Sequence, residues 1–273
     1  MESEPESPDA TGTGPRRRGV LRGGVAALAV AAGVGGAVAA TSYSDRADAR
    51  MRGGAAEVPD LGGVRSVHVM WRAHTTDPVM ALTFDDGPGA TLTAPLLEVL
   101  REEKVRATFC LVGQRAYEHR DLVRQQMRDG HELANHTWTH ADLSLLEYDL
   151  VRVELDRTDQ LLAELTGRGP AVIRPPYGRL SGAVLERAAL AHQDVLLWDV
   201  RFQESRFDSA GNAAYVLDSI GPGSVLLGHD NGSATRHIGT QAVPEIIREA
   251  KRRGYTFLTA SEMLARDHPP TST

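Results

Sequence analysis

Short apolar runs alternate with amphipathic segments along most of the chain, from about Val67 onward. Seven of these runs have the length and composition of buried strands. They cover residues 79–84, 107–112, 132–135, 171–174, 194–199, 224–228 and 255–258. An alternating stretch before them, Val67–Trp71, is a candidate for an additional strand.

The segments between the runs have the spacing of helices. One predicted face contains Leu96, Leu97 and Leu100; a longer one contains Leu150, Val153, Leu161, Leu162 and Leu165; a third contains Ala242, Ile246, Ile247 and Ala250. Strands that alternate with helices predict βαβ units and a parallel sheet. About 185 residues of this pattern predict an α/β fold, a barrel of about seven parallel strands in a single domain.

The first forty residues have a different organisation. Basic residues at Arg16–Arg18 precede Gly23–Ala40, which carries no charge and ends in small residues suited to cleavage. The segment Arg17–Arg22 also resembles a twin-arginine export signal. We therefore expect residues 1–40 to be an export signal that contacts the export machinery transiently, and the protein to be secreted or associated with the cell wall. Alternatives are a retained membrane anchor over residues 20–40 and a disordered cytoplasmic tail.

Residues 41–66 are rich in Gly, Ala, Asp and Arg without periodicity, which predicts a linker. The globular domain is expected over 67–265, followed by a tail over 266–273. The net charge is −6, and the chain has no block of basic residues beyond the N-terminal segment, so nucleic acid is not an expected partner. A single cysteine excludes an internal disulfide framework, whereas ten histidines leave ample material for a histidine-based metal site.

Two adjacent carboxylates, Asp85 and Asp86, follow the apolar run 79–84, and Gly87-Pro88 then ends the strand. If both were ionised side by side, their repulsion would raise one pKa unless a cation lay between them. Alone, the hexapeptide Thr83–Pro88 favours a polar turn with solvated aspartates. Its position at the carboxyl end of a strand is, however, where barrel enzymes carry their active groups.

Two histidines, His136 and His140, follow the run 132–135 and are four residues apart. On a helix or a tight turn, this spacing brings both imidazoles to one side. With Asp86 they form a set of three ligands that leaves a position for water, as hydrolytic zinc sites require. The alternative is a pair of surface histidines.

Two further strand ends carry polar residues. Arg174-Pro175-Pro176-Tyr177-Gly178 forms a rigid loop able to present a main-chain N–H to developing negative charge. A buried Arg174 needs an anion, and Asp85 is the candidate; an ordinary proline-rich loop with a salt bridge is the alternative. His229 ends the run 224–228 at the same rim, which makes proton transfer plausible, and a carboxylate after Trp198 is expected to orient it.

Together the four motifs TFDDGP, HTWTH, RPPYG and LLGHD resemble the polysaccharide deacetylase family, the NodB-homology domain of carbohydrate esterase family four. The resemblance covers roughly residues 77–262. It implies a distorted (β/α) barrel with one divalent metal, usually zinc, with cobalt as another candidate. It also implies removal of acetyl groups from N-acetylated sugars or, in some members, from O-acetylated xylan.

The resemblance assigns roles to individual residues. It implies that Asp86, His136 and His140 are the metal ligands. It further implies that Asp85 is the base that takes a proton from the metal-activated water, that Arg174 holds this base, and that His229 is the acid. Pro176 and Tyr177 are implied to bind substrate, with the Tyr177 N–H as oxyanion donor, and Leu227 to form part of the acetyl pocket. One motif departs from the family pattern. Glu204-Ser205 stands where the family usually has Asp-Trp, so Glu204 is expected to tune His229 from a longer side chain.

The leading hypothesis is therefore an exported, metal-dependent deacetylase acting on the N-acetylated sugars of peptidoglycan or a chitin-like polysaccharide. An acetyl-xylan esterase would use the same residues on an ester. A non-catalytic glycan-binding domain is the alternative of another class, although such a domain need not keep both Asp85 and His229. The oligomeric state is not predicted.

Overall fold

The computed structural model describes residues 65–267. The expected export signal over 1–40, nearly all of the linker 41–66 and residues 268–273 of the tail lie outside the described residues. The last helix runs to Asp267, two residues beyond the domain end expected at 265. Within 65–267, no helix is both long and apolar enough to cross a membrane.

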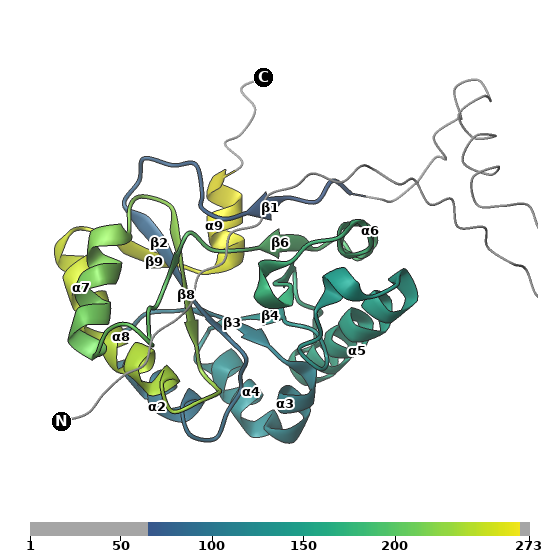
Figure 1. The fold of residues 1–273 in the computed structure, drawn as a ribbon, viewed down its shortest axis with the longest axis horizontal. Helices are drawn as coiled ribbons and strands as arrows, with labels where there is room; N and C mark the ends of the chain where they lie inside the picture. Colours follow the sequence, from purple (N-terminus) through teal and green to yellow (C-terminus); the bar gives the residue numbers. More distant parts are fainter. Residues whose placement is uncertain (1–64, 268–273) are drawn as a thin grey trace, which may run out of the picture. The chain divides into compact units, whose positions relative to one another are not determined.

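In the described residues 65–267, nine strands form one curled sheet in which all neighbouring strands are parallel (Figure 1). They are β1 (Val69–Met70), β2 (Val79–Asp85), β3 (Thr108–Leu111), β4 (Glu132–Asn135), β5 (Val172–Ile173), β6 (Asp194–Leu196), β7 (Val200–Arg201), β8 (Ser224–His229) and β9 (Thr256–Leu258). The order is β1-β6-β5-β4-β3-β2-β8-β7, and β9 also pairs with β2. The predicted barrel-like parallel sheet is confirmed.

Nine strands form in the described part of the chain, where the pattern predicts about seven, for two local reasons. The candidate strand around Val69 does form, as β1. The run 194–199 ends early at Leu196, and a separate strand β7 begins at Val200. Between them the Asp199 carboxylate accepts hydrogen bonds from Val225 N at 2.7 Å and Ser224 Oγ at 2.9 Å, and the Asp199 N–H donates to the Val225 carbonyl at 3.3 Å, so Asp199 is already bound to β8 before β7 begins.

Helices lie around the sheet (Figure 1). They are α2 (Thr93–Glu102), α3 (Gly113–Glu118), α4 (Arg120–Arg128), α5 (Tyr148–Thr166), α6 (Gly182–Leu190), α7 (Ser209–Ser219), α8 (Arg236–Arg252) and α9 (Ala260–Asp267), with 3₁₀ turns at Leu143–Leu145 and Pro176–Gly178. The predicted apolar faces of α2 and α8 are buried. The predicted face of α5 is wrong at Leu150 and Val153, which are exposed, because the helix turns Val151 and Leu155 to the core instead.

Strand β2 is the centre of the sheet. It is buried along its whole length, and it pairs with β8 on one side and with β9 and then β3 on the other. Its last residue, Asp85, is in register with His229 at the end of β8. The carboxyl ends of β2, β4, β5 and β8 therefore bring the four sequence motifs to one rim of the barrel.

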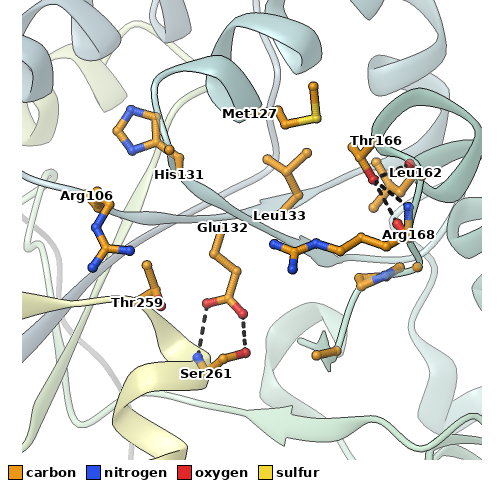
Figure 2. Close-up of a pocket in the computed structure, with 14 residues that line it drawn as sticks. Arg106, Met127, His131, Glu132, Leu133, Leu162, Thr166, Arg168, Thr259 and Ser261 are labelled. Carbon is orange, nitrogen blue, oxygen red and sulfur yellow. Dashed lines mark hydrogen bonds between the residues drawn. The ribbon is translucent and has the colours of Figure 1, made fainter.

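A cavity of about 250 Å³ lies at the amino-terminal ends of β3, β4 and β5, away from this rim (Figure 2). Glu132 reaches across it to Ser261, where its Oε2 accepts from the backbone N–H at 3.0 Å (Figure 2). Above it, His131 Nδ1 accepts a hydrogen bond from Ala107 N at 3.2 Å, while Nε2 is buried without a partner. The amino-terminal face of such a barrel serves stability rather than catalysis.

Candidate metal centre and active site

The turn after β2 separates its two carboxylates. Asp86 has a left-handed backbone (φ 73°), unusual for a residue with a side chain, and strain of this kind concentrates at functional sites. Its carbonyl oxygen accepts hydrogen bonds from Arg115 Nη1 and from Asn231 Nδ2, the latter at 3.3 Å. A Cβ at Gly87 would lie 2.2 Å from Asp230 Oδ1, so only glycine fits beside that buried carboxylate.

Asp85 is buried and paired with Arg174. Arg174 Nη1 donates to Asp85 Oδ1 at 2.7 Å and to Thr83 Oγ1 at 2.8 Å, and its other nitrogens donate to the carbonyls of Leu196 and Leu197. Burial alone would raise the pKa of Asp85, but the Arg174 guanidinium and nearby histidines outweigh it and hold that pKa below its usual value. Asp85 is therefore a fixed, ionised carboxylate.

The two histidines lie on a tight turn after β4, where Thr137 and His140 both have left-handed backbones. His136 Nδ1 lies 2.6 Å from the carbonyl oxygen of Arg174 and donates its proton there. In the neutral ring, Nε2 therefore carries a lone pair, and this atom lies 3.6 Å from Asp86 Oδ1. His140 Nε2 is 3.1 Å from the same oxygen.

These side chains fit a divalent cation. One ligand atom from each of Asp86, His136 and His140 lies within 4.8 Å of the others. Asp86 Oδ1 is buried and accepts no well-oriented hydrogen bond, which a cation between it and the imidazoles would remedy. Burial opposes ionisation of Asp86, yet the two histidines hold its pKa well below the usual range. A carboxylate and two imidazoles are the donor set of hydrolytic zinc sites.

The loop after β5 closes one side of the centre. Tyr177 has a left-handed backbone (φ 61°), and its ring packs edge-on against His140 with centroids 5.0 Å apart. The residue is 61% exposed and lines the cavity described below. Pro176 is buried at the start of the 3₁₀ turn and supports the loop from beneath.

A cavity of about 540 Å³ opens over these residues, large enough for a sugar unit. It is lined by Asp85, Asp86, His136, His140, Tyr177, Trp198, Arg201, Phe202, Gln203, Glu204, Ser205, Leu227, His229, Ser233, Thr235 and Arg236. Eight of the ten site residues expected from the sequence line it. Arg174 and Pro176 are buried and are not among the lining residues.

His229 and Glu204 also line the cavity, and Arg236 contacts both of them. Arg236 Nη1 donates to Glu204 Oε2 at 2.8 Å and also contacts His229 Nδ1. The direct separation of His229 Nδ1 from Glu204 Oε1 is 3.9 Å, too long for a hydrogen bond. Burial lowers the pKa of His229 to about 4, and the Arg236 charge acts in the same direction against the nearby aspartates.

Sequence reasoning missed three residues that contact the centre: Arg115 and Asn231 on the Asp86 carbonyl, and Arg236 on His229. Asn231 directly follows the LLGHD motif, which is a signal that could have been used. Arg115 and Arg236 stand on helices with no spacing that points to the site. Among the carboxylates after Trp198, Asp199 bonds to the start of β8 and Glu204 alone approaches His229.

Comparison with known proteins places this arrangement among carbohydrate deacetylases. A model of the polysaccharide deacetylase family matches residues 72–195. A peptidoglycan-N-acetylglucosamine deacetylase of Bacillus cereus is 32% identical over 205 residues, 74% of this chain and 95% of that protein. The peptidoglycan-N-acetylmuramic acid deacetylase PdaC of Bacillus subtilis is 29% identical over 196 residues, 70% of this chain and 40% of that protein.

A solved structure gives the same answer for the fold. The crystal structure of the Bc1960 peptidoglycan N-acetylglucosamine deacetylase, in complex with 4-naphthalen-1-yl-N-oxidanyl-benzamide, matches with a TM-score of 0.69 at 30% identity. The match covers 71% of this chain and 91% of that one. Sequence identity of this extent, the shared curled parallel sheet and the four motifs at one rim lead to one conclusion. The chain belongs to the polysaccharide deacetylase family and is a hydrolase of carbohydrate esterase family four.

Proposed function

We propose that this protein is a metal-dependent deacetylase that removes acetyl groups from the N-acetylated sugars of peptidoglycan. The observation that carries the proposal is the meeting of Asp86, His136 and His140 beside the Arg174-bound Asp85 in one open cavity. The names of the relatives in Bacillus cereus and Bacillus subtilis support peptidoglycan as the polysaccharide.

Asp86, His136 and His140 would hold the cation, with zinc favoured by the donor set and cobalt as a substitute. A divalent cation at this site supplies Lewis acidity toward the acetyl carbonyl and lowers the pKa of water. The His136 Nδ1–H bond to the Arg174 carbonyl fixes the ring so that Nε2 remains the ligand atom.

The remaining residues divide the proton transfers between them. Asp85 accepts the proton of the attacking water, and Arg174 keeps that carboxylate ionised and aimed at the cavity. The backbone N–H of Tyr177 stabilises negative charge on the acetyl oxygen. His229, which also lines the cavity, protonates the departing amine, and Leu227 lies on the wall that receives the acetyl methyl group.

We also propose that the protein is exported, because its substrate lies outside the cytoplasm and residues 1–40 have the composition of an export signal. Fractionation of cells that make the full chain, with N-terminal sequencing of the exported form, tests this. Recovery of the intact chain only in the cytoplasm would contradict it, and an intact chain in the membrane fraction would favour the anchor.

Acetate release by the purified full chain tests the activity. Peptidoglycan, N-acetylglucosamine oligomers and acetylated xylan are compared before and after chelation and after addition of zinc or cobalt. We expect wild type to release acetate from the two N-acetylated substrates and to lose this activity on chelation. Added metal should restore acetate release in wild type, whereas Asp86→Asn should release no acetate with or without added metal. Faster release from xylan would favour the esterase, and release that is unaffected by chelation would rule out the metal-dependent reaction.

A further inference from the structure

The positively charged side chain of Arg236 contacts His229 Nδ1, where a catalytic acid would be expected to have a hydrogen-bond acceptor. Arg236, the first residue of α8, donates to Glu204 Oε2 and contacts His229 Nδ1 through the same Nη1 atom. All three side chains line the active-site cavity. Glu204 is nearly buried and Arg236 is about three-quarters buried, so this contact is largely shielded from solvent.

The chemistry of arginine fixes the tautomer of His229. A guanidinium stays protonated and has only donors, so His229 Nδ1 must be the acceptor in this contact. A neutral His229 then carries its single proton on Nε2. To act as an acid toward an amine, however, His229 must carry a proton on both nitrogens. A proton on Nδ1 would point at the guanidinium of Arg236, so the two compete for the same position.

Glu204 is placed to receive that second proton's hydrogen bond. Its Oε1 atom is buried, has no hydrogen-bond partner and lies 3.9 Å from His229 Nδ1. The longer side chain of a glutamate fits here because α8 has a glycine opposite it. A Cβ at Gly239 would lie 2.7 Å from Glu204 Oε1.

Charged or titratable groups face His229 from several surrounding elements. Asp85 at the end of β2 and Asp86 after it favour its protonation, and the Glu204 carboxylate in the segment after β7 lies 3.9 Å from Nδ1. His136 at the end of β4 and Arg236 on α8 oppose it. Of the opposing groups, only Arg236 touches the ring.

We propose that Arg236 is a positioning residue for His229: held by Glu204, its guanidinium occupies Nδ1 and competes with the proton that His229 needs there to act as the acid. This rests on the proposed function, in which His229 serves the leaving amine. In the resting enzyme Glu204 binds Arg236, and in the charged state Nδ1–H of His229 donates to Glu204 Oε1. Arg236 thereby sets the pH at which the acid is available.

Two measurements on the full-length, zinc-loaded protein test this role. Nitrogen-15 spectra of the histidine side chains report the protonation of Nδ1 and Nε2 directly, with His229 identified from its absence in His229→Gln. The pH dependence of kcat/KM on N-acetylglucosamine oligomers reports the acid in turnover. Arg236→Met removes the donor and the charge at similar length, and Arg236→Lys restores a cation.

The matched control is Arg201→Met, which removes an equal charge from the wall of the same cavity. In wild type we expect a neutral His229 protonated on Nε2. In Arg236→Met we expect titration of His229, and the alkaline limb of kcat/KM, to move up by about one pH unit, a tenfold change. Arg236→Lys should move most of the way back toward wild type.

The proposal would be overturned if His229 titrated in Arg236→Met at the same pH as in wild type. It would also be overturned if Arg201→Met shifted the titration of His229 equally, because the net charge of the cavity would then explain the effect. If Arg236→Met misfolds, the proposal is decided by the titration of His229 in Arg236→Lys and by the tautomer of His229 in wild type, where a proton on Nδ1 of the neutral ring would contradict it. If wild type releases no acetate from any substrate, the proposed function fails, whereas the His229 spectra still establish whether Arg236 holds Nδ1.

Discussion

Arg174 and Asp85 form an ion pair inside the barrel, with 2.7 Å between Nη1 and Oδ1 and no solvent exposure of the guanidinium. Two charges taken out of water are stable only when their geometry and their remaining hydrogen bonds are good. Thr83 and two carbonyls accept hydrogen bonds from three of the other four N–H groups of Arg174. The carboxylate of Asp85 is therefore built into the core and depends on it for its position and charge.

We expect Arg174→Met to lose about 3–5 kcal/mol of unfolding free energy, because it leaves Asp85 buried without a counter-charge. Chemical denaturation of the metal-free protein measures this. The control is Arg266→Met, which breaks an exposed pair with Asp77 and should cost no more than about 1 kcal/mol. Equal losses in the two variants would contradict the buried-pair interpretation.

Metal binding should stabilise the folded state. At a zinc concentration 100 times the dissociation constant, the gain is about 2.7 kcal/mol by mass action. Thermal unfolding of wild type should shift upward on zinc addition, whereas His140→Ala, which removes one of the three proposed ligands, should respond weakly. An equal shift in His140→Ala would show that the stabilising zinc binds elsewhere.

A methyl group on α8 should disturb the active site through Glu204. Gly239→Ala places a Cβ 2.7 Å from Glu204 Oε1, and overpacking of this kind costs about 1–3 kcal/mol. We expect lower stability by denaturation and lower acetate release. Gly182→Ala on α6 is the matched control, because no atom lies within 4 Å of its Cβ. If both variants behaved like wild type, Glu204 would have room that the structure does not show.

Stability should fall in mild acid because of His131. Burial lowers its pKa from 6.5 to about 4, so the unfolded chain takes up a proton at a pH where the folded chain does not. Stability is then full above pH 6.5 and declines as the pH falls toward 4, by up to about 3 kcal/mol. His131→Asn keeps an acceptor for Ala107 N and removes the titration. Denaturation curves at several pH values should show a smaller decline in this variant.

Much of the fold and of the candidate site follows from strand ends that the sequence marks clearly. Gly87-Pro88 stops a fully apolar strand and Pro175-Pro176 follows another, so side chains at one rim could be predicted. The core face of α5 could not, because apolar residues occur on more than one side of this helix and packing selects Val151 and Leu155 over Leu150 and Val153.

The role of Arg236 was hidden for a different reason. It begins α8, seven positions after His229, and its contact with Glu204 joins two residues that are 32 positions apart. No periodicity within either segment describes a contact between them. Only the three-dimensional arrangement shows which of several arginines turns back toward the cavity.

Strand β2 has neighbours on both sides for almost all of its length, β8 on one and β9 followed by β3 on the other. A strand clamped in this way opens only when the whole sheet does, so its amide protons should be among the slowest to exchange with solvent. Asp85 and Asp86 sit at its end. Local opening of β2 therefore does not displace these two carboxylates, and we expect denaturant to displace them only when the whole sheet unfolds.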